Sequence, residues 1–259
     1  MPYPDGPLKT RAVVKPGIYA LVPPEGRVFN VIPGLENCRT TILCTPKIGA
    51  GFVQYIGTAQ AGGGCAKSAF GAAEGVETFI HFLDGEGELE LAVGGRTETF
   101  GQGGYAYAPA GKGIHFKNVG AKPLRFLLYK QRYIPHPDPA RVPAPVFGNL
   151  NDIKERSYDE MENVFVRDLL PVDETYDMNM HTLSFAPGGC HPFIETHVQE
   201  HGAYIYEGQG MYLLDDDWLS VQPEDFLWFG PYTKQACYGT GRGRLSYIYS
   251  KDCHRDVEI

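Results

Sequence analysis

Hydrophobic and polar residues alternate in short runs along most of the chain, and turn residues separate these runs. Apolar and aromatic side chains recur at every second position, which is the period of a half-buried β-strand. Clusters of Gly, Pro and Asp between the runs are typical of tight turns. The middle of the chain is predicted to form strands at residues 52–56, 77–83, 88–93, 105–108 and 124–129. The pattern predicts an all-β, antiparallel protein built from many short strands.

The same layout of strands occurs a second time between residues 180 and 251. The turn sequence DGEG at 84–87 matches EGQG at 207–210, which places Gly208 at 123 positions after Gly85. In each half a strand, a turn, an aromatic strand and a final strand follow. An internal duplication of one small antiparallel barrel explains this repeat.

The duplication divides the chain into four parts. We expect an N-terminal arm with outer strands at 1–50, a first barrel at 51–133, a linker with a short helix at 134–160, and a second barrel at 161–259.

The linker is rich in proline between residues 134 and 145, which favours an extended and stiff segment. Asn149 or Asn151 could cap a short helix over 149–158. A strand-like run at 164–170 then begins the second barrel.

Composition and charge exclude several partners. The chain of 259 residues has 23 Lys and Arg against 31 Asp and Glu, a net charge of −8, and its basic residues are scattered. This argues against a nucleic acid or an anionic membrane surface as partner. No segment approaches the roughly 20 apolar residues of a membrane helix. Six cysteines without a CxxC pair, and an N-terminus without an apolar stretch, predict a cytoplasmic protein without a disulfide framework.

Residues 189–208, GCHPFIETHVQEHGAYIYEG, hold the strongest chemical signal. Glu195, His197 and His201 occupy odd positions, so an extended run would point all three to one face. One carboxylate and two imidazoles suit Mn²⁺, Fe²⁺ or Zn²⁺ better than Ca²⁺. The alternative is a hydrogen-bonded cluster or an exposed polar face.

The spacing of these residues points to a known superfamily. Five residues separate Gly189 from Glu195, one separates Glu195 from His197, three separate His197 from His201, and six separate His201 from Gly208. This resembles the first metal-binding motif of the cupin superfamily, with Glu and His exchanged between two positions. The best candidate for the ligand of the second motif is Gln235, which follows Pro231 at a gap one residue shorter than usual.

A Gln amide oxygen is a plausible neutral fourth ligand. Glu, two neutral His and Gln would leave a dication site with a net charge of about +1, and an octahedral ion would keep two positions open.

The first copy lacks these ligands. The matching positions hold Ala72, Glu74, Thr78 and Ile114. His115 is one residue out of phase and His81 is three residues late, so we expect both to be structural histidines. The first barrel is then expected to be a scaffold or an oligomer interface.

Further polar residues accompany the candidate ligands. Period two places Tyr247, Tyr249 and Lys251 on one face of the last strand, with Tyr204 and Tyr212 expected in strands nearby. Near a dication Lys251 would lose its proton more easily, and it could act as an acid or base or pair with a substrate carboxylate. The alternative for Lys251 is a solvated lysine at a strand end.

Longer stretches extend the likeness over nearly the whole chain. They are ETHVQEHGAY at 195–204, the run 218–235, the C-terminal run 246–259, and, in the first half, 11–15, 31–38 and 129–135. They resemble the (S)-ureidoglycine aminohydrolase family, bicupins of purine (allantoin) degradation. The residue types that are unusual for a cupin are the ones that this family uses to hold Mn²⁺.

The resemblance implies two tandem cupin barrels and a manganese-dependent hydrolase acting on carbon–nitrogen bonds of linear amidine-type compounds. Such an enzyme releases ammonia from the small molecule (S)-ureidoglycine and gives (S)-ureidoglycolate. The resemblance implies that Glu195, His197, His201 and Gln235 hold the metal. It also implies that Glu195, Gln235, Tyr247 and Lys251 bind substrate, that Lys251 and Glu195 transfer protons, and that the protein is a homo-oligomer.

Two other readings of the residues stay open. A cupin dioxygenase would use two open positions on Fe²⁺ for O₂ chemistry. A non-catalytic cupin would be a storage-like protein or a small-molecule sensor, although storage cupins usually lack the ligands and no helix-turn-helix pattern accompanies them here.

Overall fold

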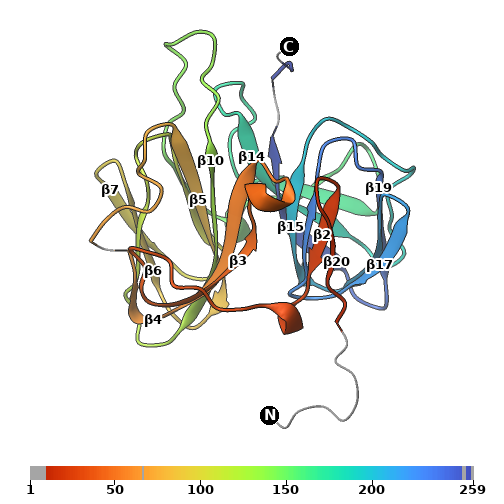
Figure 1. The fold of residues 1–259 in the computed structure, drawn as a ribbon, viewed down its shortest axis with the longest axis horizontal. Coiled ribbons are helices and arrows are strands. Elements are labelled where there is room, and N and C mark those ends of the chain that lie inside the picture. The colour runs from red at the N-terminus through yellow and green to blue at the C-terminus, as the bar shows by residue number, and fades with distance from the viewer. Residues whose placement is uncertain (1–9, 66, 253–254, 258–259) are drawn as a thin grey trace.

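The computed structural model describes residues 10–65, 67–252 and 255–257, and its described part contains twenty strands and three short 3₁₀ helices. The strands form two barrels that lie side by side (Figure 1). The 3₁₀ helices are η1 (Pro24–Gly26), η2 (Pro46–Ile48) and η3 (Leu150–Asp152). The expectation of an all-β bicupin architecture is therefore confirmed.

The first barrel is a nine-stranded sheet in the order β11-β8-β5-β10-β4-β9-β6-β7, with β3 paired to β4. Its strands are β3 (Glu36–Cys44), β4 (Phe52–Gly64), β5 (Val76–Gly85), β6 (Leu89–Val93), β7 (Arg96–Phe100), β8 (Gly104–Ala108), β9 (His115–Asn118), β10 (Leu124–Arg132) and β11 (Val146–Asn149).

The second barrel combines an eight-stranded sheet, β1-β2-β18-β15-β20-β14-β13-β12, with a three-stranded sheet, β17-β16-β19. Its strands are β1 (Val13–Lys15), β2 (Tyr19–Val22), β12 (Arg156–Ser157), β13 (Val164–Asp168), β14 (Met178–Phe185), β15 (His201–Glu207), β16 (Gln209–Leu214), β17 (Asp217–Val221), β18 (Phe226–Phe229), β19 (Gln235–Thr240) and β20 (Leu245–Asp252).

The two barrels pair their strands in the same register, as a duplication requires. In the first barrel β10 pairs with β4 and places Leu128 opposite Tyr55. In the second, β20 pairs with β14 and places Tyr249 opposite His181. On the other side of the final strand, Leu128 is opposite Ile80 and Tyr249 is opposite Ala203. Ala203 lies 123 positions after Ile80, the same offset that relates Gly208 to Gly85.

The N-terminal strands extend the second barrel and not the first. β2 pairs with β18, with Leu21 opposite Leu227, and the red β2 lies among the blue strands in Figure 1. Within the expected N-terminal arm, β1 and β2 are therefore outer strands of the second barrel of their own chain. The sequence of 13–22 shows two strand-like runs but carries no mark of the distant partner.

Two local expectations are wrong. The predicted helix over 149–158 is one 3₁₀ turn at Leu150–Asp152, in which the Asn149 side chain accepts from the Asn151 backbone N–H, and β12 follows. The predicted extended run over 189–208 becomes a strand at His201, and residues 191–200 form an irregular segment. Pro192 has no backbone N–H to donate, and the run pairs with β19 only through isolated bridges at Cys190 and Glu195.

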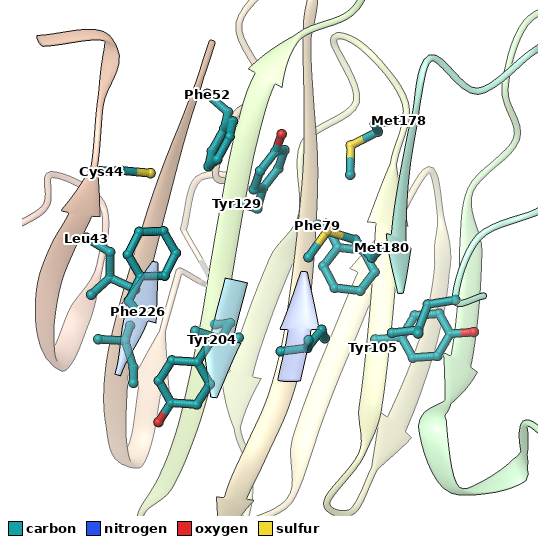
Figure 2. Close-up of a cluster of buried hydrophobic side chains, with 14 of the residues drawn as sticks. Leu43, Cys44, Phe52, Phe79, Tyr105, Tyr129, Met178, Met180, Tyr204 and Phe226 are labelled. Atoms are coloured by element: carbon teal, nitrogen blue, oxygen red, sulfur yellow. The ribbon is translucent and has the colours of Figure 1, made fainter. Parts of the chain in front are cut away.

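Period two sorts the strand residues into three apolar layers: the interior of each barrel, and a layer between the barrels. On β15, Ala203 and Ile205 point into the second barrel, whereas Tyr204 points into the layer between. Figure 2 shows this shared layer, where Phe52, Phe79 and Tyr129 of the first barrel lie near Met178, Met180 and Phe226 of the second. Each such buried side chain contributes about 1.5–3 kcal/mol of transfer free energy.

Two further expectations concern the environment of the chain. The five cysteines among the described residues are free thiols, and Cys253 lies outside the described residues. Within the described ranges no helix is long and apolar enough to cross a membrane.

Candidate active site

A cavity of about 460 Å³ opens into the second barrel and collects the residues that the sequence singled out. Its lining includes the six predicted site residues, Glu195, His197, His201, Gln235, Tyr247 and Lys251, together with Tyr212 and Tyr249. Tyr204 is not among them. Its side chain points to the opposite face of β15, and its hydroxyl accepts from Arg125 at 3.1 Å in the layer between the barrels.

Two strand starts and one loop bring the candidate ligands together. His201 begins β15 and Gln235 begins β19. Glu195 and Gln235 exchange backbone hydrogen bonds of 2.8 and 2.9 Å, and the Tyr232 N–H donates to the His197 carbonyl at 2.7 Å. The irregular segment 191–200 is thereby held against the start of β19, so Glu195 and His197 reach the cavity without being on a strand.

The polar side chains form one chain of short contacts across the cavity. The Nε2 atoms of His197 and His201 lie 3.4 Å apart, and the Gln235 amide lies 2.6 Å from His197 Nε2. The Tyr212 hydroxyl donates to Gln235 at 3.3 Å and lies 3.5 Å from the Tyr247 hydroxyl. This contact chain joins residues from four strands and one loop.

The hydrogen bond of His201 fixes its tautomer. Its Nδ1 lies 2.8 Å from the Ser250 carbonyl oxygen, which can only accept, so Nδ1 carries the proton and Nε2 presents a lone pair. Burial lowers the pKa of His201 well below its usual value, and burial also lowers the pKa of His197. Both imidazoles are therefore neutral near pH 7, which is the form that binds metals.

This arrangement fits a divalent ion. The lone pair of His201 faces the ring of His197, whose Nδ1 is buried without a hydrogen-bond partner among the described residues. A half-turn of the Gln235 amide presents its oxygen to the same point, because the Tyr212 hydroxyl can donate or accept. No three His, Cys, Asp or Glu side chains in the described ranges form a ready cluster, so the two imidazoles and the amide are the nearest donors, with Glu195 on the cavity wall.

Glu195 lies in an environment suited to proton transfer. Its half-buried position raises the pKa of its carboxyl group, the positive charge of Lys251 opposes that rise, and Asp159 adds to it. A carboxyl group with a raised pKa and an ammonium group therefore act on one another across a small cavity.

Sequence reasoning missed part of the lining. His191 is buried at the cavity wall, and burial lowers its pKa to about 4. It belongs to the same GCHPFIE stretch as Glu195, at another odd position, so the pattern contained a signal for it. Tyr158 and Asp159 come from the segment before β13 and carry no local signal, because tertiary contact alone brings them here.

The described residues of the first barrel contain no counterpart of this site. Ala72 and Glu74 are exposed, and Ile114 is fully buried in the apolar interior. His115 Nδ1 contacts the Cys65 carbonyl oxygen at 3.1 Å. His81 is buried between the barrels, where burial lowers its pKa to about 4. Both histidines lie away from any equivalent of the cavity, as expected from their phase.

Two tandem all-β barrels, of which one holds a polar cavity lined by imidazole, amide and carboxyl groups, define a bicupin with a single candidate centre. No family model matches the chain. It is 48% identical over 258 residues to (S)-ureidoglycine aminohydrolase of Escherichia coli (strain K12), covering 99% of this chain and 97% of that protein. It is 33% identical over 260 residues to the probable (S)-ureidoglycine aminohydrolase of Oryza sativa subsp. japonica, covering 98% and 79%.

A solved structure agrees with these relatives. The crystal structure of protein Ylba from E. coli superposes with a TM-score of 0.85 at 46% identity and covers 96% of this chain and 97% of that one. The chain belongs to the (S)-ureidoglycine aminohydrolase family of enzymes.

Proposed function

We propose that this chain is a manganese-dependent hydrolase that converts (S)-ureidoglycine into (S)-ureidoglycolate and ammonia in purine degradation. One observation carries the proposal beyond family membership: two neutral imidazoles, an amide, a carboxyl group and an ammonium group line one small cavity. The cavity of about 460 Å³ suits a small polar substrate.

Glu195, His197, His201 and Gln235 would hold the ion. A bound Mn²⁺ would supply a positive centre that fixes the position of electron-rich substrate atoms. This role agrees with the neutral state of both imidazoles and with the lone pair that the His201 tautomer presents.

The substrate carries an amino group and a ureido nitrogen on one carbon, and this chemistry assigns roles to two side chains. The Lys251 ammonium donates a proton to the amino group, which leaves as ammonia while the ureido nitrogen keeps its hydrogen and uses its lone pair to form a protonated imine. Water then adds to the imine carbon and gives its proton to the Glu195 carboxylate. Tyr247 and Gln235 orient the substrate, so that water attacks one face.

The test is ammonia release from freshly generated ureidoglycine, measured before and after chelation and again after Mn²⁺ is restored. We expect activity to disappear with the metal and to return with Mn²⁺. Full activity in verified metal-free protein would contradict the metal assignment. Oxygen consumption in the same assay separates this reaction from a cupin dioxygenase, because hydrolysis consumes no O₂.

The proposal includes a cytoplasmic homo-oligomer without nucleic-acid or membrane partners. Light scattering of the purified protein measures the oligomeric state directly, and a monomer would contradict that part.

A further inference from the structure

A second pair of ionisable residues lies behind the wall of the cavity. His181 on β14 has its Nδ1 at 2.8 Å from Asp168 Oδ1 on β13. Arg156 on β12 holds the other Asp168 oxygen at 2.8 Å. None of these three residues belongs to the cavity lining or to the mechanism above.

The position of His181 on its strand directs it toward the site. Its neighbours at period two, Leu183 and Phe185, belong to the interior of the second barrel. His181 is 6% exposed and stacks on Tyr249, a cavity residue, with ring centroids 5.2 Å apart and an interplanar angle of 28°. The His181 side chain therefore lies directly behind Tyr249, a residue of the cavity wall.

Asp168 fixes which nitrogen of His181 carries the proton. The bond to His181, helped by Arg156, lowers the pKa of Asp168 to about 2, so the carboxylate accepts from Nδ1–H. Burial lowers the pKa of His181, which is therefore neutral near pH 7. Its Nε2 is a lone-pair acceptor, and it is buried without a hydrogen-bond partner among the described residues. A buried acceptor of this kind is costly unless a donor reaches it.

Lys251 is the donor that the sheet geometry offers. Tyr249 is opposite His181 in the register of β14 and β20, so Lys251, two residues on, is the diagonal neighbour on the same face. The first barrel shows that such a pair makes contact. There Lys130 and Tyr55 occupy the positions of Lys251 and His181, and Lys130 Nζ lies 5.7 Å from the centroid of the Tyr55 ring.

We propose that His181, oriented by Asp168, is a positioning residue whose Nε2 accepts a hydrogen bond from the Lys251 ammonium when the active site is loaded. A hydrogen bond to a buried acceptor fixes the direction of an otherwise flexible lysine side chain. His181 thereby aims the Lys251 ammonium group at the leaving amino group. The proposal rests on the proposed function for the role of Lys251.

Two substitutions of His181 distinguish the role of its Nε2 acceptor from the role of its aromatic ring. His181→Phe keeps the aromatic stack on Tyr249 but removes the lone pair, and His181→Gln restores an oxygen acceptor at similar reach. We expect the Phe variant to lose about 10- to 100-fold in kcat with KM within about threefold and with metal content unchanged. We expect the Gln variant to recover most of kcat. Equal kcat for wild type and Phe variant, or equal loss in both variants, would overturn the proposal.

The matched control is His81→Phe, which replaces another buried neutral histidine, one that lies between the barrels. It should leave kcat and KM unchanged, which excludes a general response to losing a buried imidazole. A kcat loss equal to that of His181→Phe would overturn the assignment.

A readout without turnover separates this proposal from the proposed function. In metal-loaded protein at one fixed pH, mass spectrometry follows how fast a small amine-directed reagent labels Lys251. Loss of the acceptor releases Lys251 from its hydrogen bond and leaves its amine freer to react, so His181→Phe should be labelled about fivefold faster or more, and His181→Gln at nearly the wild-type rate. Unchanged labelling in His181→Phe overturns the contact even if ammonia release is established, and accelerated labelling supports it even if the substrate is a different one.

Discussion

The two barrels share one register but have opposite interiors. At corresponding positions of the final strand the first barrel has Phe126 and Leu128, and the second has Tyr247 and Tyr249. At the second-motif position the first has Ile114 and the second has Gln235. Hydroxyl and amide groups therefore replace hydrocarbon at matching places on one scaffold.

This difference shows how a duplicated fold divides stability and chemistry. The apolar interior of the first barrel contributes burial free energy without a polar cavity. The second barrel keeps polar groups that cost free energy unless each finds a partner, and its contact chain from His201 to Tyr247 supplies most of those partners. The second barrel can tolerate such a site because a shared apolar layer joins it to the first.

The largest expected effect comes from removing an imidazole from the contact chain. His197→Ala should lose bound metal and about 10³-fold or more of the ammonia release, because the three remaining donors include only one imidazole and bind a divalent ion weakly. Metal analysis and a coupled ammonia assay measure both effects in one preparation. A variant that is active without metal would show that the cavity does not need the ion.

The lysine that the two barrels share gives the next test. Lys251→Met should lower kcat by about 10²- to 10³-fold with metal content unchanged, because it removes the general acid but no metal donor. The control is Lys130→Met at the corresponding position of the first barrel, where the ammonium packs over Tyr55 and Phe70 at 5.7 and 5.2 Å. Lys130→Met should retain activity, and retained turnover in Lys251→Met would remove that residue from the mechanism.

A substitution that creates a cavity in the first barrel should lower stability and leave catalysis intact. Ile114 is fully buried, so Ile114→Ala should lower the free energy of unfolding by about 2–5 kcal/mol. Denaturant unfolding measures the loss, and kcat of the folded variant should remain within about twofold of wild type. A large fall in kcat with an intact fold would mean that the first barrel contributes to the chemistry.

The smallest effect is a dependence of stability on pH. His81 has a folded pKa of about 4 against an ordinary value of 6.5, because burial disfavours its charged form. Between pH 6.5 and about pH 4 the His81 imidazole is protonated in the unfolded chain but neutral in the folded chain. The free energy of unfolding therefore falls as the pH falls through this range. His81→Phe should remove about 2 kcal/mol of the stability difference between about pH 7 and pH 5. Urea unfolding of both proteins at these two pH values measures this, and parallel pH profiles would contradict it.

The sequence by itself predicted the all-β strand pattern, the duplication and the side chains that line one cavity of the second barrel. Period two placed Tyr247, Tyr249 and Lys251 on one face, and all three line the cavity. The phase of His81 and His115 predicted structural histidines, and the structure places His81 between the barrels and His115 Nδ1 against the Cys65 carbonyl oxygen. These features were readable because strand period and turn residues act over a few positions, within reach of a local pattern.

Tertiary structure alone decided which strands and loops meet. Nothing in residues 13–22 indicates that they complete the second barrel, and no local pattern indicates that Tyr158 reaches the cavity. Glu195 and His197 meet His201 through a loop held by the backbone of Gln235 and Tyr232, and not through the straight strand that their spacing suggested. Such contacts depend on backbone pairing between distant segments. Backbone pairing is compatible with many different sequences, so the local sequence does not reveal which segment will be the partner.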